Sequence, residues 1–101
     1  DQLSQFKADE VILSVDGVCR GAGLTTYQAD EAEVSRKMIE RSRIAIIVAD
    51  YTKIEHESFL KIADITAASY LVTNRKADSA LLNEIKSCGV TIITDAINEK
   101  S

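Results

Sequence analysis

Residues 16–26 carry side chains that suit a small polar ligand. A carboxylate stands at the start of this segment, two threonines stand at its end, and glycines lie between them. Glycines let backbone N–H groups approach a ligand, and the N-terminus of a following helix attracts anions. The glycine spacing differs from that of a Walker-type loop and no lysine precedes the threonines, so an ordinary turn with a threonine cap is the alternative. The candidate ligand-binding residues of this segment are Asp16, Gly17, Gly23, Thr25 and Thr26.

Two further charged residues are candidates for ligand binding. Lys53 follows a strongly apolar run, where its ammonium group could neutralise a phosphate or donate to a sugar hydroxyl; a solvated surface lysine is the alternative. Glu33 precedes Lys37 by one helical turn, and an ion pair at this spacing stabilises a helix by about 0.2–0.5 kcal/mol. That ion pair is sufficient to explain Lys37. Glu33 stays a candidate because it lies in the turn nearest the expected crevice.

The apolar runs predict the strands that position these residues. Residues 44–49 are unbroken and indicate a strand buried on both faces, as in a parallel sheet covered by helices. Residues 10–15, 67–73 and 90–94 predict three more strands. Open α/β sheets bind ligands beyond the carboxyl ends of their strands, so the polar residues that follow the strands are expected at one edge. These residues are Asp16, Asp50, Asn74 and Asp95, and turn chemistry alone accounts for much of the pattern at the last two.

A helix is expected between the first two of these strands. Asp30 and Glu33 are spaced as a capping box, with Thr26 as an earlier candidate for the cap. The first turn is acidic and the later turns are basic, an order that complements the helix dipole. The inward-facing stripe is expected at Val34, Met38 and Ser42, with Ile39 beside them.

The remaining connections complete the predicted fold. Residues 18–26 show no helical period and are expected to form a loop, and residues 59–65 fit either a short edge strand or a half-buried turn. Asp78 or Ser79 caps a second helix, which Gly89 stops. The alternation of strands and helices predicts an α/β fold: a mostly parallel, Rossmann-like sheet with right-handed crossovers and helices on both faces. The inward residues of the second helix are expected to be Leu81, Leu82 and Ile85.

Composition limits the class of protein. The chain has 101 residues, of which 46% are hydrophobic and 28% charged, as is typical of one globular domain. We expect its core at residues 8–95, between terminal segments 1–7 and 96–101. The net charge is −4 and lysines and arginines are not clustered, which argues against a nucleic-acid surface within this chain. No apolar stretch is long enough to span a membrane and no signal-peptide pattern is present, so a cytoplasmic location is expected.

The residues that most often hold metals or act as nucleophiles give no such pattern here. Cys19 and Cys88 lie far apart without metal-type spacing, and we expect two reduced thiols. His56 is the only histidine, and the sequence places no metal-binding partners near it. No catalytic residue, cofactor or metal is therefore predicted. Because Asp1 is no initiator residue, we expect the chain to be part of a longer polypeptide.

Taken in order, these segments resemble the effector domain of the DeoR (deoxyribose-operon repressor) family over about residues 8–95. Each piece is common alone, whereas their order and spacing together are specific. Proteins of this family are bacterial repressors of sugar metabolism: an N-terminal winged helix-turn-helix binds operator DNA, and a C-terminal domain senses a phosphorylated sugar. The matching pieces are Asp16-Gly17, Gly23-Leu24-Thr25-Thr26, the helix with Glu33, Lys37 and Met38, Ala49-Asp50-Tyr51-Thr52-Lys53, Val72-Thr73-Asn74 and Gly89-Val90.

The resemblance implies that this chain is the C-terminal part of such a sensor. A phosphorylated sugar is then its effector, and a homo-oligomer is its expected assembly. The DNA-binding domain, and a first portion of the sensor with another glycine-rich phosphate loop, would lie outside the chain. The implied fold is similar to that of ribose-5-phosphate isomerase and of CoA-transferases.

The match to the isomerases themselves is partial. Asp16-Gly17 stands where they have an Asp-Gly-Ala-Asp loop, and residues 50–53 resemble their Asp-x-Ser-Lys segment with Thr52 in place of the serine. The second aspartate of the loop is missing, and their catalytic glutamate falls near Ser35 rather than on Glu33. Since isomerisation needs a positioned carboxylate base, binding without turnover is the preferred interpretation.

Three functions are compatible with the sequence. The leading hypothesis is the effector-binding domain of a DeoR-type repressor, with Asp16 and Glu33 on sugar hydroxyls and Lys53 on an anionic or hydroxyl group. A fragment of a sugar-phosphate isomerase or CoA-transferase-like enzyme is the second. A pure oligomerisation module with a vestigial crevice is the third.

Overall fold

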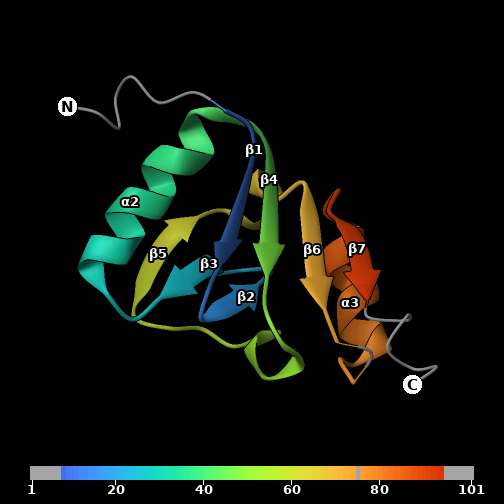
Figure 1. The fold of residues 1–101 in the computed structure, drawn as a ribbon. Helices are drawn as coiled ribbons and strands as arrows, with labels where there is room; N and C mark the ends of the chain where they lie inside the picture. Colours follow the sequence, from blue (N-terminus) through green and yellow to red (C-terminus); the bar gives the residue numbers. More distant parts are fainter. Residues whose placement is uncertain (1–7, 75, 95–101) are drawn as a thin grey trace, which may run out of the picture.

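A four-stranded parallel sheet forms the centre of the structure (Figure 1). The computed structural model describes residues 8–74 and 76–94. The sheet contains β1 (Ala8–Ser14), β4 (Ser42–Val48), β6 (Tyr70–Thr73) and β7 (Thr91–Thr94), in that order across the sheet, and every neighbouring pair is parallel. Each of the four predicted strands is present, which confirms the prediction of an α/β fold with a parallel sheet.

The two faces of this sheet differ in burial. The register pairs Leu13 with Ile47 and Ile47 with Leu71, so these side chains share one face, where Ile47 and Leu71 are almost fully buried. Ile12 and Val48 belong to the opposite face, and 67% of Ile12 is exposed. We expected helices on both faces; within the described residues both helices contribute to the core on the buried face, together with a second sheet.

The second sheet is antiparallel and has three strands. It contains β2 (Gly17–Cys19), β3 (Gly23–Thr26) and β5 (Leu60–Ala63), in that order. The prediction of a loop over residues 18–26 is wrong, because Val18 and Leu24 pair with each other in a hairpin and are both fully buried. Of the two interpretations of residues 59–65, the structure shows the strand, which is followed by the 3-10 helix η2 (Ile65–Ala67).

Helix α2 (Ala29–Glu40) begins without the predicted cap. Its N-cap residue is Gln28, whose side chain makes no capping hydrogen bond. Asp30 and Glu33 lie inside the helix, so the predicted capping box is wrong. The acidic first turn is present at Asp30 and Glu31, and these carboxylates complement the positive end of the helix dipole.

The inward face of α2 is also rotated from the predicted stripe. Ala32 and Ser35 are its buried residues, whereas 42% of Val34 is exposed. Ile39 packs against the core as a partly buried residue, and Ser42 already belongs to β4. The stripe predicted through Val34 and Ser42 is therefore wrong, since sequence spacing alone does not fix the helix face that packs.

Helix α3 (Ser79–Lys86) follows its local signals closely. Asp78 is the N-cap, and its carboxylate accepts hydrogen bonds from the backbone N–H groups of Ala80 (2.8 Å) and Leu81 (3.4 Å). Leu82 and Ile85 are buried in the core, as predicted. Gly89 has a φ of +98°, the left-handed conformation that ends helices.

Some predictions lie beyond the described part of the chain. Asp95 and the terminal segments 1–7 and 96–101 fall outside residues 8–74 and 76–94. None of the described helices has the length and apolar character needed to cross a membrane.

Candidate functional site

The segments that leave β1 and β4 run side by side at the carboxyl edge of the sheet. Val18 forms a parallel bridge with Ile54, and the Glu55 N–H donates to the carbonyl of Val18 at 2.6 Å. The 3-10 helix η1 (Tyr51–Lys53) leads directly into this contact. The predicted gathering of polar segments beyond neighbouring strands is therefore present.

Asp16 is joined to the start of α2 through Thr26. The Thr26 hydroxyl lies 2.9 Å from Asp16 Oδ2 and 3.1 Å from Glu31 Oε1, and the Tyr27 N–H donates to Asp16 Oδ2 at 3.1 Å. Thr26 is almost fully buried. A hydroxyl carries one proton, so it donates to one carboxylate at a time and leaves the other able to accept from a ligand.

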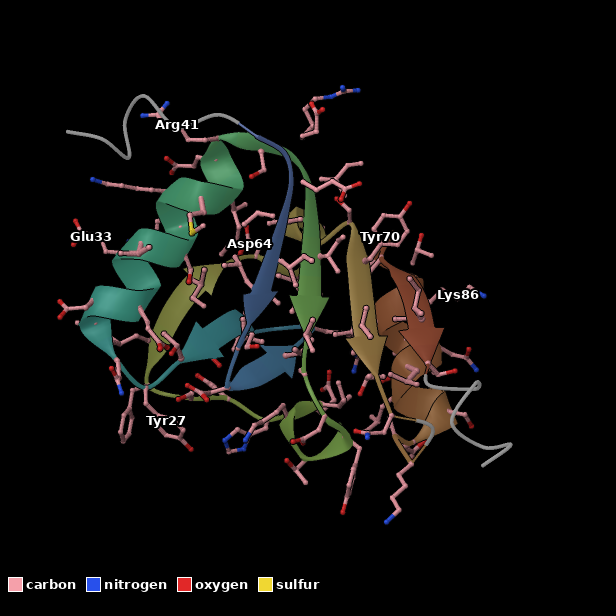
Figure 2. The ribbon with its side chains drawn as sticks, in the orientation of Figure 1. Tyr27, Glu33, Arg41, Asp64, Tyr70 and Lys86 are labelled. Carbon is pink, nitrogen blue, oxygen red and sulfur yellow. The ribbon has the colours of Figure 1, made fainter. Side chains whose placement is uncertain are left out.

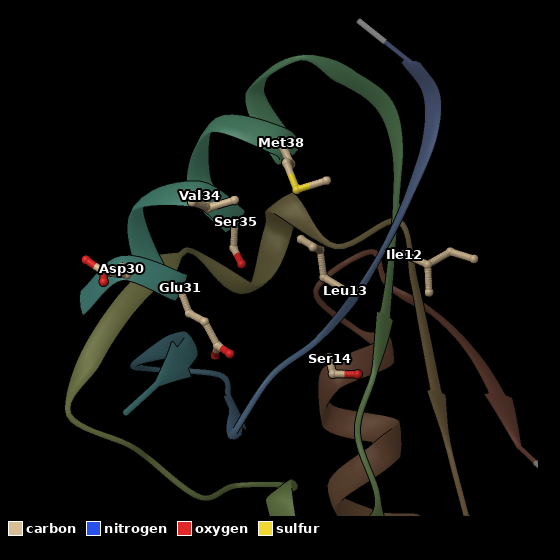
Figure 3. A pocket seen from close by; sticks show the side chains of 8 residues that line it. All are labelled: Ile12, Leu13, Ser14, Asp30, Glu31, Val34, Ser35 and Met38. Atoms are coloured by element: carbon tan, nitrogen blue, oxygen red, sulfur yellow. The ribbon is translucent and has the colours of Figure 1, made fainter. Parts of the chain in front are cut away.

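A pocket of about 410 Å³ opens beside this cluster, between β1 and α2 (Figure 3). Leu13, Val34 and Met38 supply apolar walls, and Glu31 and Ser35 point from α2 toward β1. The complete lining consists of Ile12, Leu13, Ser14, Asp30, Glu31, Val34, Ser35 and Met38. An apolar pocket with a few convergent polar groups is the usual form of a small-molecule site.

Ser35 is the most confined polar group of this pocket. Only 9% of the residue is exposed, and its hydroxyl makes no hydrogen bond to any of the described residues. The Ser35 oxygen is not one of the fully buried unpaired atoms of the described residues, so it is open to a water or ligand atom in the pocket that it lines.

Close packing and hydrogen bonding constrain three residues at this edge, Gly17, Gly23 and Thr25. A Cβ on Gly17 would lie 2.3 Å from both the His56 carbonyl oxygen and Thr25 Oγ1. Gly23 has a φ of +84°, and a Cβ there would lie 2.3 Å from the carbonyl oxygen of Ala63. Thr25 is buried and accepts a hydrogen bond from the Ser58 N–H at 2.9 Å. These residues hold the hairpin against its neighbours whatever their role in binding.

Lys53 lies in the neighbouring turn, whose structure is set by Asp50. The Thr52 N–H donates to Asp50 Oδ1 at 2.8 Å, and the Thr52 hydroxyl donates to the same oxygen. These bonds, and more weakly the charge of Lys53, hold the pKa of Asp50 below its ordinary value of 3.8. Lys53 itself is half-buried. Asn74 accepts from the Tyr51 N–H at 2.8 Å, so the ends of β4 and β6 are tied together.

Glu33 lies on the side of α2 that faces away from the sheets (Figure 2). The structure therefore brings Asp16 and Thr26 together with Glu31, a residue that the sequence did not single out. Residues 31, 35 and 38 share one helix face because they are spaced by about one and two turns, whereas residue 33 lies on the opposite side. If Ser35 had been recognised as a buried position, Glu31, which lies one turn before it on the same helix face, would have been identified as a candidate.

Metal-binding or nucleophilic side chains do not gather elsewhere in the described ranges. No group of three or more histidine, cysteine, aspartate or glutamate residues there could hold a metal ion. Cys19 and Cys88 are free thiols, each half-buried. Cys19 is 4.0 Å from Glu55 Oε1 and Cys88 is 3.6 Å from the carbonyl of Glu84, so both make weak structural contacts.

A comparison with protein families identifies one match. The sequence model described as "DeoR C terminal sensor domain" matches residues 1–75. The matched range includes β1, the pocket, the Asp16–Thr26–Glu31 cluster and Lys53.

Curated relatives are transcription regulators by name. The chain is 31% identical over 91 residues to the HTH-type transcriptional regulator GlpR of Haloferax volcanii, covering 90% of this chain and 36% of the relative. It is 26% identical over 99 residues to the HTH-type transcriptional repressor GlcR of Bacillus subtilis, covering 98% and 38%. It is 31% identical over 71 residues to the glycerol-3-phosphate regulon repressor of Haemophilus influenzae, covering 70% and 28%. The chain thus spans roughly a third of the length of these relatives.

Proposed function

Because the chain belongs to the family of DeoR C-terminal sensor domains, we propose that it is the effector-binding part of a bacterial repressor of sugar metabolism and that its effector is a phosphorylated sugar. The observation that carries this proposal is the pocket between β1 and α2, which lies beside the Asp16–Thr26–Glu31 cluster at the carboxyl end of β1. Ligands of open α/β sheets bind at this edge. The name of one relative, the glycerol-3-phosphate regulon repressor of Haemophilus influenzae, refers to a compound of the same class and supports this choice of ligand.

The residue roles follow from charge and position. Asp16 and Glu31 accept hydrogen bonds from sugar hydroxyls, and Thr26 links the two carboxylates. Lys53 supplies positive charge from the adjoining turn for the phosphate or a hydroxyl. Gly17, Gly23 and Thr25 act through the backbone that they hold in place. Glu33 keeps its predicted role on a sugar hydroxyl only if a further segment of the protein closes over the outer face of α2.

Sensing requires binding without turnover. A ligand that prefers one arrangement of the domains shifts the population toward that arrangement. The factor by which the ligand changes the affinity for DNA equals the factor by which DNA changes the affinity for the ligand. In this proposal a winged helix-turn-helix outside the chain binds the operator, the complete protein is a homo-oligomer, and it acts in the cytoplasm.

One observation favours the enzyme alternative as second candidate. Glu31 is a carboxylate at the pocket, and proton transfer between adjacent carbons needs a positioned carboxylate base. Conversion of a sugar phosphate by the complete protein, abolished by Glu31→Gln, would select an isomerase over a sensor.

Calorimetric titration of the complete protein with a panel of sugar phosphates tests the main proposal. We expect at least one of glycerol 3-phosphate, glucose 6-phosphate and fructose 6-phosphate to bind and to release the protein from its operator, and the unphosphorylated compounds to bind far more weakly. Failure of a folded, complete protein to bind any phosphorylated sugar would refute the proposal.

A further inference from the structure

We infer that the pocket between β1 and α2 receives the hydroxyl-bearing end of the effector, not its phosphate, and that Ser35 and Glu31 determine which sugar is accepted. This inference rests on the proposed function and adds the orientation of the ligand. It is carried by the charge of the lining, the confinement of Ser35 and the shape of the apolar walls.

The charge of the pocket opposes a phosphate. Its lining contains two carboxylates, those of Asp30 and Glu31, and neither lysine nor arginine is among the lining residues. Two like charges about 4 Å apart repel by about 1 kcal/mol in water and by several times more near a protein surface. The carboxylates at the start of α2 also occupy the helix end that would otherwise attract an anion. A neutral ligand group avoids this repulsion.

The polar groups of the pocket match hydroxyls. The Glu31 carboxylate is an acceptor, and its Oε1 lies 3.1 Å from a Thr26 hydroxyl that Asp16 shares. Ser35 can both donate and accept, is nine-tenths buried, and has no hydrogen-bond partner among the described residues. Figure 3 shows both side chains pointing from α2 into the space beside β1. A sugar hydroxyl donates to Glu31 while a neighbouring one pairs with Ser35.

The apolar walls suit the carbon chain between those hydroxyls. Leu13, Val34 and Met38 line the same pocket, and they offer no competing hydrogen bonds. The C–H surface of a sugar or polyol can therefore leave water at this place with little cost in free energy. With the hydroxyl end in the pocket, the phosphate extends beyond it, toward cationic groups such as Lys53 or those of further segments of the complete protein.

Two substitutions in the complete protein test the inference, with a matched control on the same helix. Glu31→Gln and Ser35→Ala are each expected to weaken binding of the best sugar phosphate of the panel by about 10-fold or more, because each removes a hydrogen bond from a hydroxyl. Glu40→Gln removes an equal charge from the last residue of α2, which does not line the pocket, and is expected to leave binding unchanged. Inorganic phosphate, added as a competitor, should displace the sugar phosphate with the same affinity in all four proteins. Thermal unfolding confirms that each variant folds.

The outcomes separate this inference from the proposed function. A wild-type protein that binds a sugar phosphate, with Glu31→Gln and Ser35→Ala binding equally well, overturns the inference and leaves the function standing. An affinity for inorganic phosphate that rises in Glu31→Gln or falls in Ser35→Ala places the phosphate in the pocket and also overturns it. Absence of binding by the wild-type protein overturns both.

Discussion

Two aspartates follow neighbouring strands of the parallel sheet, yet their surroundings differ. Asp16 accepts hydrogen bonds from Thr26 and Tyr27, ten and eleven residues away, and shares Thr26 with Glu31 of α2. Asp50 accepts from Thr52, two residues away, and fixes only its own turn. At equivalent strand ends, Asp16 thus joins three elements of the fold, whereas Asp50 stabilises only a local turn. The long-range tie is the one that lies beside the pocket.

The difference predicts a graded response to substitution. Changes around Asp16 must disturb β2, β3 and α2 together, because contacts between distant segments hold that region. Changes around Asp50 should stay within η1, because local hydrogen bonds form as soon as the turn does.

The largest effect is expected at Gly17. Gly17→Ala would place a Cβ 2.3 Å from a backbone oxygen of residue 56 and from Thr25 Oγ1, and such overpacking costs about 3 kcal/mol or more. Gly21→Ala is the control, since nothing lies within 4 Å of a Cβ there and the cost should stay within about 0.5 kcal/mol. Urea unfolding measures both. Equal stabilities would show that the hairpin next to Asp16 is no more constrained than a free turn.

A smaller effect is expected from Thr26→Val, which keeps the shape of the side chain. Asp16 and Glu31 lose the hydroxyl between them, which should cost about 1–3 kcal/mol because Thr26 is almost fully buried. The same change should also weaken effector binding, since it leaves the two carboxylates without their link. Thr52→Val is the matched control at the Asp50 turn. If it proved as destabilising as Thr26→Val, the contrast between the two aspartates would disappear.

The smallest effect is expected from Asp50→Asn and depends on pH. The hydrogen bonds from the Thr52 hydroxyl and N–H hold the pKa of Asp50 below 3.8, so the folded state binds a proton less readily than the unfolded state. The stabilisation is therefore complete above pH 3.8 and is lost as the pH falls through the lower pKa of the folded protein. The stability difference between wild type and Asp50→Asn should shrink over that range. A difference that grows on acidification would contradict this sign.

How well the sequence predicted each element depended on how local its signals are. The core strands follow from apolar runs, and α3 follows from Asp78 and Gly89, which act on residues next to them. The hairpin of β2 and β3 was missed because all four residues of β3 are buried, so it lacks the alternation of a half-exposed strand. The face of α2 was missed because packing decides it, and Glu31 was missed with it.

The parallel pairing of β1 with β4 has a consequence for the order of synthesis. Ala8 pairs with Ser42 and Ser14 with Val48, so β1 leaves the ribosome well before its partner exists. At about 5–20 residues per second, the nascent chain waits for roughly a few seconds before β1 can pair with β4. The hairpin between Cys19 and Gly23 closes within about 10 μs of its emergence. The β2–β3 hairpin can therefore begin to form before β1 has its β4 partner, and we expect chaperone binding during translation to centre on β1.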